Sequence, residues 1–542
     1  MTSTTGATPP DPLLKAPPTA AVLTAPPPAA GTPEARLPIQ TRSADRVATV
    51  QPLQPVPLQG QRATVGWFQR AVGLVILGTA LLGAAMIWLA IGHEGAVPAA
   101  RPSEGLLFGI WQVLYDTEAP SLRVVLAAGG LALLFAAGVA SLERRVVGRA
   151  RRSNNPAVAP LAPKIVMSET RDVFAGPVTV TVLIPAHNEE MCLETTLRSL
   201  LEQSHRPERI VVVADNCTDT TADIARELGA EVFETTGNQH KKAGALNQAL
   251  AQILPDQGDN DLVMAMDADT TLDDGFLEAA VWRMTDDRAL MAVGGLFYGD
   301  EGSGLLGQFQ RNEYIRYARE IRRRRGRVFV LTGTASLFRP RALRTVAAER
   351  GRSLPGVPGD YYDTVVLTED NELTLALKSL GALMISPLAC TVVTEVMPTW
   401  QALWAQRLRW QRGALENLGA YGVRPQTLRY WAQQLGIGYG VIALSTYLLL
   451  ILLMFISLDA WVWFPFWLGI GLVFTVERVV TVWRGGLRAR LLAATLFPEL
   501  GFALYLNVIY VKGIVDITMG RRAAWQHVVQ PGSAGPVRVT QS

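Results

Sequence analysis

Five long apolar runs fall into two groups that flank a mixed central region. The first group is Val72–Ile91 and Val124–Leu142. Each run has about 20 uncharged residues, enough to cross a hydrocarbon core of roughly 30 Å. The second group consists of Ile437–Leu458, Trp461–Val482 and Leu491–Val515. We therefore expect two transmembrane helices within residues 66–150 and about three within residues 436–520.

Charges beside these runs set the expected orientation in the membrane. Arginines precede the first run and follow the second, whereas the loop between them is acidic. Basic residues favour the cytosolic side, so the amino terminus and the region after Leu142 are predicted to lie in the cytosol. Further arginines between the last two runs fit this orientation. The arginines are Arg42, Arg46, Arg62, Arg70, Arg144, Arg145, Arg149, Arg151, Arg152, Arg484, Arg488 and Arg490.

The last apolar run is unlike the others because it contains Pro498, Glu499 and Asn507. These residues are costly where they face lipid, so the run is expected to be a helix that faces its neighbours or a re-entrant segment. Five spans would place the tail at residues 521–542 outside, yet Arg521 and Arg522 favour the cytosol. The sequence therefore does not decide on which side of the membrane this tail lies.

Strand-like and helix-like patterns alternate in the central region. Val178–Ile184 is dense in Val, Thr and Ile, as in a buried strand, and leucines with helical spacing follow it. Alternating strands and helices predict a mostly parallel sheet with helices on its faces, in which ligands bind at the carboxyl ends of the strands. We assign this α/β domain to residues 164–400. Its other expected elements are strands at Ile210–Ala214, Glu231–Glu234 and Leu262–Met266 and helices at Leu193–Leu201, Ala222–Leu228 and Ala243–Leu254.

Composition adds limits to this picture. The 542 residues are 49% apolar and 18% charged, fewer charges than a typical soluble domain carries. A net charge of +3 gives no reason to expect nucleic acid as a partner. Cys192, Cys217 and Cys390 are too few and too scattered for a disulfide framework or a zinc site. Residues 1–65 are rich in Pro and Ala without an apolar period, so we expect a disordered cytosolic tail.

Acidic residues collect where the predicted strands end. Glu189 follows the first strand, Asp215 the second, and Asp267 and Asp269 the fourth. Two carboxylates one residue apart can hold Mg²⁺ or Mn²⁺ together with substrate phosphates. Lys242 opens the helix after the third strand, where its ammonium and the helix N-terminus can contact a diphosphate. Taken alone, a lysine such as Lys242 is more often a solvated surface charge.

Helix capping is the alternative explanation for several polar residues. Asn188 and Thr218 precede helices and suit caps as well as ligands. Thr368–Asp370 also precedes a helical pattern, where acidic residues favour the helix dipole. If the segment is functional, it supplies a general base beside an acceptor hydroxyl. Such a base typically raises a reaction rate by about 10²–10⁴. Gly333 and Thr334 lie in a turn of small residues, where a backbone can approach a ligand closely.

A helical pattern over Trp400–Leu418 carries a further polar group. Gln406, Arg409 and Trp410 are spaced i, i+3 and i+4, so they share one face of the helix. We expect amphipathic interface helices over residues 400–435. The structural alternative to a binding role is a helix that only anchors the chain at the membrane interface through its aromatic residues. The residues expected to rest in the membrane interface are Trp400, Leu403 and Trp404.

Together these motifs resemble the membrane-embedded family 2 glycosyltransferases, which include cellulose, chitin, hyaluronan and poly-N-acetylglucosamine synthases. The resemblance covers about Val178–Leu418 and lies in the order of the motifs, each of which is weak alone. No gating-loop motif of the cellulose-synthase type follows Trp410, so the poly-N-acetylglucosamine and hyaluronan group is the nearest. The motifs are Pro185–Glu189, the Asp215 region, Lys242–Asn247, Asp267–Asp269, Gly333–Ser336, Thr368–Asp370, Thr394–Pro398 and Gln406–Trp410.

The resemblance implies a GT-A fold inserted between the two groups of transmembrane helices, and a role for each motif. The donor, a UDP-sugar, would contact Glu189 and Asp215 through its uridine end and Lys242 and Asp267 through its diphosphate. The metal, Mg²⁺ or Mn²⁺, would be held by Asp269 with Asp267. The catalytic base would be Asp370, beside Glu369. The acceptor side would be lined by Gly333, Thr334, Gln406, Arg409 and Trp410.

These roles predict an inverting transfer at the cytosolic face of the cell membrane, with one displacement giving a β-linkage from an α-linked donor. The favoured product is a processively made, exported polysaccharide that contains N-acetylglucosamine. Two alternatives stay open, namely addition of one sugar to a lipid acceptor and a catalytically inactive membrane scaffold. The expected partners are the donor, a growing glycan or lipid acceptor and the lipid bilayer, and an accessory membrane subunit or a homo-oligomer is compatible with this reading.

Overall fold

The structure is a computed structural model that describes residues 103–107, 111–115, 122–171, 173, 178–324, 326–457 and 465–521. All described residues belong to one compact unit, which lies within Arg62–Ser542. The predicted disordered tail at 1–65, the first predicted span at Val72–Ile91 and residues 522–542 lie outside the described residues.

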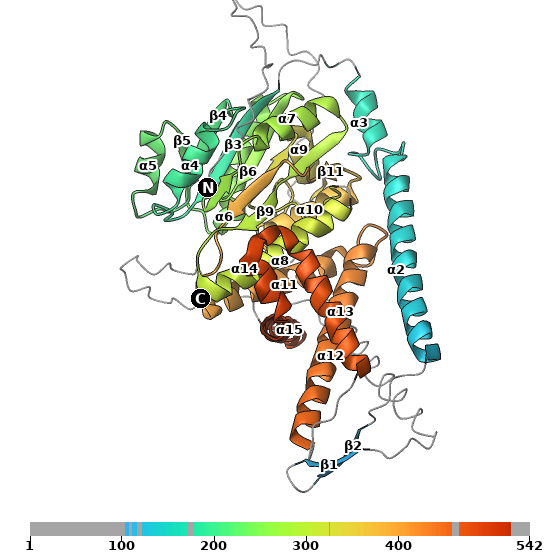
Figure 1. Ribbon diagram of the computed structural model, residues 1–542. Helices are drawn as coiled ribbons and strands as arrows, with labels where there is room; N and C mark the ends of the chain where they lie inside the picture. Colours follow the sequence, from blue (N-terminus) through green and yellow to red (C-terminus); the bar gives the residue numbers. More distant parts are fainter. Residues whose placement is uncertain are drawn as a thin grey trace, which may run out of the picture. The chain divides into compact units, whose positions relative to one another are not determined.

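A seven-stranded sheet forms the centre of the α/β domain (Figure 1). Its strand order is β11-β8-β10-β6-β3-β4-β5, and β10 is antiparallel to both of its neighbours while the other pairs are parallel. The prediction of a mostly parallel α/β sheet is therefore confirmed. The strands are β3 Thr179–Ala186, β4 Arg209–Ala214, β5 Glu231–Glu234, β6 Asp261–Met266, β8 Leu290–Gly294, β10 Ala335–Phe338 and β11 Leu383–Ile385.

Alternating side chains give the sheet two buried faces. In β3, Val182 and Ile184 point to one cluster of buried residues and Leu183 to another, as the two-residue period of a strand requires. The helices α4, α5 and α7 cover the first face, and α6, α9 and α10 cover the second. Their bounds are α4 Leu193–Leu201, α5 Thr221–Glu227, α6 Lys241–Ile253, α7 Phe276–Asp286, α9 Pro340–Glu349 and α10 Glu369–Ser379, and a short helix α3, Pro163–Glu169, precedes the sheet.

A second, three-stranded sheet with the order β7-β12-β9 lies next to the strand ends. Its strands are β7 Thr270–Leu272, β9 Leu296–Gly299 and β12 Thr391–Thr394. Thr394 pairs with Thr270, so the residue after β12 lies beside the residue before β7. This pairing brings Glu395 toward Asp269, two residues that are far apart in the sequence.

Two long helices connect the α/β domain to the remaining helices. They are α8, Gly304–Arg323, and α11, Trp400–Tyr421. Thr399 caps α11, because its Oγ1 accepts a hydrogen bond from the backbone N–H of Ala402 at 3.1 Å. The expectation that Leu403 rests in a membrane interface is wrong, since its side chain is fully buried against Phe309 and Phe502.

The remaining helices include those predicted to span the membrane. They are α2 Leu122–Arg151, α12 Leu428–Ser457, α13 Pro465–Thr481, α14 Gly486–Ala494 and α15 Phe497–Thr518, with a hairpin of β1 Ser103–Leu107 and β2 Trp111–Tyr115 before α2. The later helical region begins at Leu428 rather than at residue 436. Among the described residues, α15 is the one helix whose length and composition would allow it to cross a membrane.

The last predicted span, Leu491–Val515, is not one helix. A break at Thr495 and Leu496 separates α14 from α15, and Leu496 adopts a positive φ of 53°. Pro498 lies in the first turn of α15, where a missing N–H costs nothing, whereas inside a continuous helix it would remove a hydrogen bond. Proline therefore explains why the apolar run begins a new helix at this point.

Candidate active site

The loops at the carboxyl ends of β3 and β4 have unusual backbone conformations. Asn188 and Asn216 have positive φ angles of 58° and 51°, a conformation that non-glycine residues adopt mainly at strained or functional positions. Asn188 Oδ1 accepts a hydrogen bond from the N–H of Thr218 at 2.8 Å, so it joins the two loops. The capping alternative is wrong for Asn188 and Thr218, because the helices begin after Cys192 and Thr220.

Asp215 joins the three loops that follow β3, β4 and β5. Its Oδ1 accepts hydrogen bonds from Asn216 Nδ2 at 3.0 Å, Thr235 Oγ1 at 2.7 Å and Asn238 Nδ2 at 2.9 Å. Its backbone carbonyl contacts Nδ1 of His187 at 2.5 Å. Asp215 is buried, so these contacts fix the edge of the sheet after β3, β4 and β5.

Four segments meet around the ammonium of Lys242, in the first turn of α6. The ammonium contacts the carboxylate of Asp267 and lies 3.2 Å from Oε1 of Glu369. The N–H of Gly333 donates to Oδ2 of Asp370 at 3.2 Å. A Cβ on Gly333 would lie 2.8 Å from Lys242 Nζ and 3.3 Å from Asp267 Oδ2. Segments that are far apart in the sequence thus converge on one point.

Burial and charge shift the pKa values of these groups in different directions. Burial raises the pKa of Asp370 to about 6, and Glu369 beside it acts in the same direction. Burial also opposes the charge on Glu369, but the ammonium of Lys242, a backbone hydrogen bond and Arg409 together outweigh it and lower the pKa of that carboxyl. Burial disfavours the ammonium of Lys242 too, yet Asp267 and Glu369 raise its pKa. Glu369 is therefore a negatively charged partner of Lys242, whereas Asp370 is a carboxyl group whose pKa lies close to neutral pH.

Acidic groups surround Asp269. Burial raises the pKa of Asp269 to about 7, and Asp267, Glu189 and Glu395 add to this effect. Among the described residues, no three His, Cys, Asp or Glu side chains are arranged to hold a metal ion by themselves. The pair of Asp267 and Asp269 still suits Mg²⁺ or Mn²⁺, because such ions are usually held by one or two carboxylates and completed by phosphate oxygens. Asp267 raises the pKa of both Asp269 and Asp370, so it lies close to both carboxyl groups.

A small pocket lies beside these groups. Its lining includes Lys242, Gly333, Tyr362 and Asp370. The position of Tyr362 is set by Asn247 of α6, whose Oδ1 accepts from the Tyr362 N–H at 2.8 Å and whose Nδ2 donates to the Tyr362 carbonyl at 2.9 Å. The Lys242–Asn247 motif therefore places an ammonium and an aromatic wall in one pocket.

The helix α11 brings Gln406, Arg409 and Trp410 to the same region. Arg409 lies close enough to Glu369 to contribute to lowering the pKa of that carboxyl. Gln406 Oε1 is buried and has no hydrogen-bond partner among the described residues. The guanidinium of Arg407 lies 4.5 Å from the centre of the Trp410 ring. A buried amide oxygen and a supported indole ring are groups that can face a polar ligand.

Three residues around the site carried no clear signal in the sequence. Arg407 is buried, stacks on Trp410 and lies 3.0 Å from Glu313 of α8, yet it occupies a variable position of the Gln406–Trp410 motif. Glu395 lies inside the Thr394–Pro398 motif, which had no predicted role, and only the pairing of β7 with β12 brings it near Asp269. Tyr362 belongs to no motif, because its place depends on contacts with Asn247.

Contacts between α11 and α10 fix the position of the Thr368–Asp370 segment. A Cβ on Gly413 would lie 2.5 Å from Thr368 Oγ1, so only glycine allows this approach. One turn later, Asn417 Nδ2 donates to Thr368 O at 3.0 Å and contacts Asn371 Oδ1 at 3.2 Å. After another turn, Tyr421 Oη donates to Oε1 of Glu372 at 2.6 Å. One stripe of α11 therefore holds the start of α10.

Comparison with known proteins agrees with this geometry. Residues 181–347 match the family described as glycosyl transferase family 2. The chain contains a family 2 glycosyltransferase domain. Its α/β sheet, with the antiparallel β10 among parallel strands, is GT-A-like, as the resemblance of its motifs implied. The match does not extend to the helices before and after this domain.

Relatives of the family 2 domain include two bacterial proteins. The poly-beta-1,6-N-acetyl-D-glucosamine synthase of Staphylococcus aureus (strain COL) is 30% identical over 247 residues, which are 44% of this chain and 55% of that protein. The probable glycosyltransferase YdaM of Bacillus subtilis (strain 168) is 30% identical over 248 residues, 43% of this chain and 54% of that protein. The chain thus spans about half the length of these relatives.

Among solved structures, the chain is similar to the mannosyltransferase PcManGT from Pyrobaculum calidifontis in complex with GDP-Man and Mn²⁺. The two are 17% identical, with a TM-score of 0.41, and the match covers 72% of this chain and 99% of that chain.

Proposed function

We propose that the protein is a membrane glycosyltransferase that transfers a sugar from a UDP-sugar to a growing glycan, forming a β-linked polysaccharide that contains N-acetylglucosamine. The observation that supports it most is the convergence of Lys242 and Asp267, which lie within the family 2 match at residues 181–347, with Glu369 and Asp370 on the Gly333 turn. The name of the S. aureus relative supports the choice of N-acetylglucosamine.

The proposed reaction uses Asp370 as the base. Its carboxylate takes the proton from the acceptor hydroxyl, and the acceptor oxygen forms a bond with the anomeric carbon of the donor sugar. The bond from that carbon to the phosphate oxygen breaks, and the electron pair leaves with the nucleoside diphosphate. The ammonium of Lys242 stabilises the charge on the leaving group. One displacement inverts the anomeric centre.

A divalent cation held by Asp267 and Asp269, when bound, would add positive charge beside the diphosphate. The residues of the chain suit this arrangement. Asp269 is surrounded by the carboxylates of Asp267, Glu189 and Glu395, an excess of negative charge that a cation would relieve. Asp267 already contacts Lys242, so the ammonium and the cation would act on the same diphosphate.

The acceptor is proposed to lie between Asp370 and α11. Gln406 offers a buried amide oxygen without a partner among the described residues, and Arg409 lies near Glu369. Trp410, supported by Arg407, offers a ring on which an acceptor sugar can stack. Glu189 and Asp215 lie at the ends of β3 and β4, and we propose that they contact the uridine end of the donor.

The experiment that tests the proposal measures sugar transfer by purified membranes with UDP-GlcNAc, UDP-glucose and UDP-glucuronate, each with Mg²⁺ or Mn²⁺. We expect a β-linked polymer from UDP-GlcNAc and a loss of at least 10²-fold in transfer for Asp370→Asn. The matched control is Asp261→Asn, at the other end of β6, which should keep the wild-type rate. Wild-type transfer by Asp370→Asn would remove this residue as the base.

Product analysis separates the proposed function from its two rivals. A long polymer supports processive synthesis, whereas a lipid that carries one sugar identifies the non-processive transferase. Trp410→Ala should shorten the product while binding of UDP stays near the wild-type value. If no UDP-sugar is turned over with any metal, the inactive scaffold replaces the proposed enzyme.

A further inference from the structure

A short irregular segment leads from α8 into the Gly333 turn. Its described residues 328–332 belong to no helix or strand, yet Val328 and Leu331 are buried. A buried segment without its own ladder of hydrogen bonds needs other groups as partners for its backbone. The position of the Gly333 N–H, which donates to Asp370, therefore depends on what holds residues 328–333, the 328–333 segment.

The helix α10 supplies these partners at regular intervals. Asp370, Thr374 and Lys378 are four residues apart, so they form one stripe along the helix, the α10 stripe. Each member of the stripe bonds to a different part of the 328–333 segment. The contacts are Lys378 Nζ to Val328 O at 2.8 Å and to Phe329 O at 3.1 Å, Leu331 N–H to Thr374 Oγ1 at 2.9 Å, and Gly333 N–H to Asp370 Oδ2 at 3.2 Å. The segment is thus fixed along its length, and the last contact is to the proposed base.

Lys378 also joins the segment to α12. Its ammonium donates to Tyr430 Oη at 2.6 Å, and Tyr430 Oη donates in turn to Phe329 O at 2.5 Å. An ammonium has three N–H groups, and the two backbone carbonyls and this hydroxyl supply three acceptors. The side-chain amide of glutamine has only two N–H groups, and methionine has none. The surroundings of Lys378 therefore match a lysine side chain in particular.

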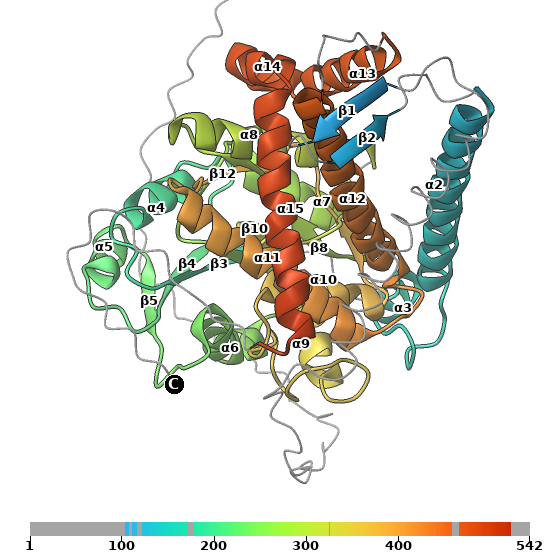
Figure 2. The same cartoon turned by 90° about the horizontal axis from the view of Figure 1, so that it is seen from below.

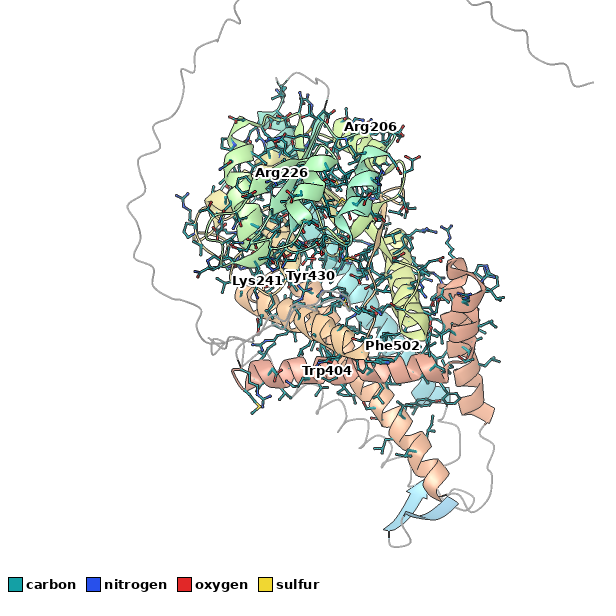
Figure 3. The ribbon with its side chains drawn as sticks, turned by 90° about the vertical axis from the view of Figure 1, so that its left-hand side faces the viewer. Arg206, Arg226, Lys241, Trp404, Tyr430 and Phe502 are labelled. Carbon is teal, nitrogen blue, oxygen red and sulfur yellow. The ribbon has the colours of Figure 1, made fainter. Side chains whose placement is uncertain are left out.

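The neighbouring residue Arg429 joins the same point to α2. Its guanidinium lies 4.8 Å from the centre of the Phe329 ring, and its Nη1 donates to Oε1 of Glu143 at 2.5 Å. Figure 2 shows the end of α2 and the start of α12 near α10. In Figure 3, Tyr430 is labelled where the α/β domain meets the helices that follow it. Helices from before and after the α/β domain therefore meet at Phe329.

We propose that Lys378 is a positioning residue for the transfer reaction, which holds the 328–333 segment on the α10 stripe and joins the Gly333–Asp370 contact to α2 and α12. The proposal rests on the proposed function, because that function makes Asp370 the base. Lys378 lies eight residues after Asp370, about 12 Å along the helix axis, so it acts through the segment and not on the reacting groups. Without its ammonium the segment loosens, and the Gly333 N–H no longer fixes the carboxylate of Asp370.

Kinetics of the full-length protein in membranes test the effect on transfer. Lys378→Met keeps the apolar stem of the side chain and removes the ammonium. We expect kcat to fall about tenfold, because a base that is held less firmly spends less time in the productive geometry. The KM for the UDP-sugar should stay unchanged, since Lys242 and β6 are not touched. The matched control is Lys512→Met, whose ammonium contacts Asp516 on its own helix, and it should keep both constants. A wild-type kcat for Lys378→Met, or a change in KM alone, would overturn the proposal.

Hydrogen exchange, followed by mass spectrometry, tests the positioning without turnover. In Lys378→Met the amides of residues 328–333 should exchange about tenfold faster than in the wild type, while β3 and β6 keep their wild-type rates. Equally faster exchange over the whole α/β domain would mean lost stability alone. Unchanged exchange over residues 328–333 would mean that Lys378 does not hold the segment. Either result overturns the proposal.

A second variant covers the case in which Lys378→Met does not fold. Tyr430→Phe keeps the ammonium but removes one of its acceptors and one donor to Phe329 O, so it should give the same local pattern of exchange to a smaller degree. Wild-type exchange in this variant would then overturn the proposal. If no UDP-sugar is turned over but the exchange is faster only over residues 328–333, the proposed function fails while the contact of Lys378 with the segment stands.

Discussion

Asp370 and Glu369 are neighbours in the sequence, yet their surroundings separate them chemically. Glu369 faces the ammonium of Lys242 at 3.2 Å, whereas Asp370 accepts N–H groups of Gly333 and Asn371. Burial therefore raises the pKa of Asp370, while the ammonium keeps that of Glu369 low. Two adjacent carboxylates with separate pKa values allow one to hold a cation and the other to exchange protons.

The pH dependence of transfer should follow Asp370. The base must be unprotonated, and its pKa is raised to about 6, so kcat/KM should level off above pH 6 and fall about tenfold for each pH unit below it. The charged groups that contribute to this pKa are Glu369, Lys242 and Asp267. The measurement is kcat/KM for the UDP-sugar between pH 4.5 and 9 at constant ionic strength. A flat profile down to pH 4.5 would contradict the assignment.

Stability gives an independent check on the same residue. A carboxyl whose pKa is raised in the folded state stabilises the fold when it is protonated, and this contribution is lost as pH rises through about 6. At pH 7 the neutral Asp370→Asn variant should therefore melt at the same temperature as the wild type or above it. A large fall in Tm would show that the variant loses activity by unfolding.

Gly333 is the residue where added volume should matter most. A Cβ would lie 2.8 Å from Lys242 Nζ, so Gly333→Ala should displace the ammonium from Asp267. We expect transfer to fall about 10²-fold, the order of loss that misplaced catalytic groups produce, with a folded protein. The matched control is Gly258→Ala, whose Cβ would meet its nearest atom, Asp261 Oδ2, at an ordinary 3.6 Å. Equal rates for the two variants would show that the Gly333 turn is not critical.

At the scale of elements, α11 connects the residues that we propose to line the acceptor side to Asp370, the proposed base. Gln406, Arg409 and Trp410 lie at its first half, and Gly413, Asn417 and Tyr421 continue one stripe along its second half. The second half holds Thr368 and Glu372 at the start of α10. Glu372 is also paired with the buried Arg350 at 2.7 Å, so this end of α10 is held from two sides.

Asn417→Ala tests whether this contact positions Asp370. The change removes buried hydrogen bonds to Thr368 and Asn371, which should lower the free energy of unfolding by about 1–3 kcal/mol. It should also lower kcat. The KM for the donor should stay unchanged, because the change does not touch α6 and β6. Tyr421→Phe should have a smaller effect, since Arg350 still satisfies Glu372. Leu415→Ala, which faces α15, is a control for lost stability alone. If Leu415→Ala lowers kcat as much as Asn417→Ala, the positioning role is wrong.

The sequence predicted the strands and helices whose signals are local. β3 to β6 and α4 to α6 appear close to their predicted bounds, because each has its own apolar period and the polar residues follow at the strand ends. The three-stranded sheet was not predicted, since β7, β9 and β12 have three or four residues each and are defined only by their pairing. For the same reason Glu395 and Arg407 were missed, because their places depend on contacts between distant segments.

At the scale of the molecule, a buried group of charges joins the α/β domain to the helices of the carboxyl-terminal region. Glu499 of α15 contacts Arg316 of α8 at 2.6 Å and lies 3.7 Å from Arg478 of α13. The helix α8 in turn packs on β9 of the α/β domain and, through Glu313, pairs with Arg407 beside Trp410. One acidic residue therefore connects three helices beneath the site.

Glu499→Ala should destabilise the whole assembly. It leaves Arg316 and Arg478 close together without a carboxylate, and breaking a buried pair in this way costs about 3–5 kcal/mol. The measurement is Tm in detergent together with the rate of transfer. Glu194→Ala is the matched control, because the Arg198–Glu194 pair is more than half exposed on both sides and such pairs contribute about 0–1 kcal/mol. Since α15 supports α11, the rate should fall along with Tm for Glu499→Ala, and an unchanged Tm would show that α15 and the catalytic domain are not held together by this contact.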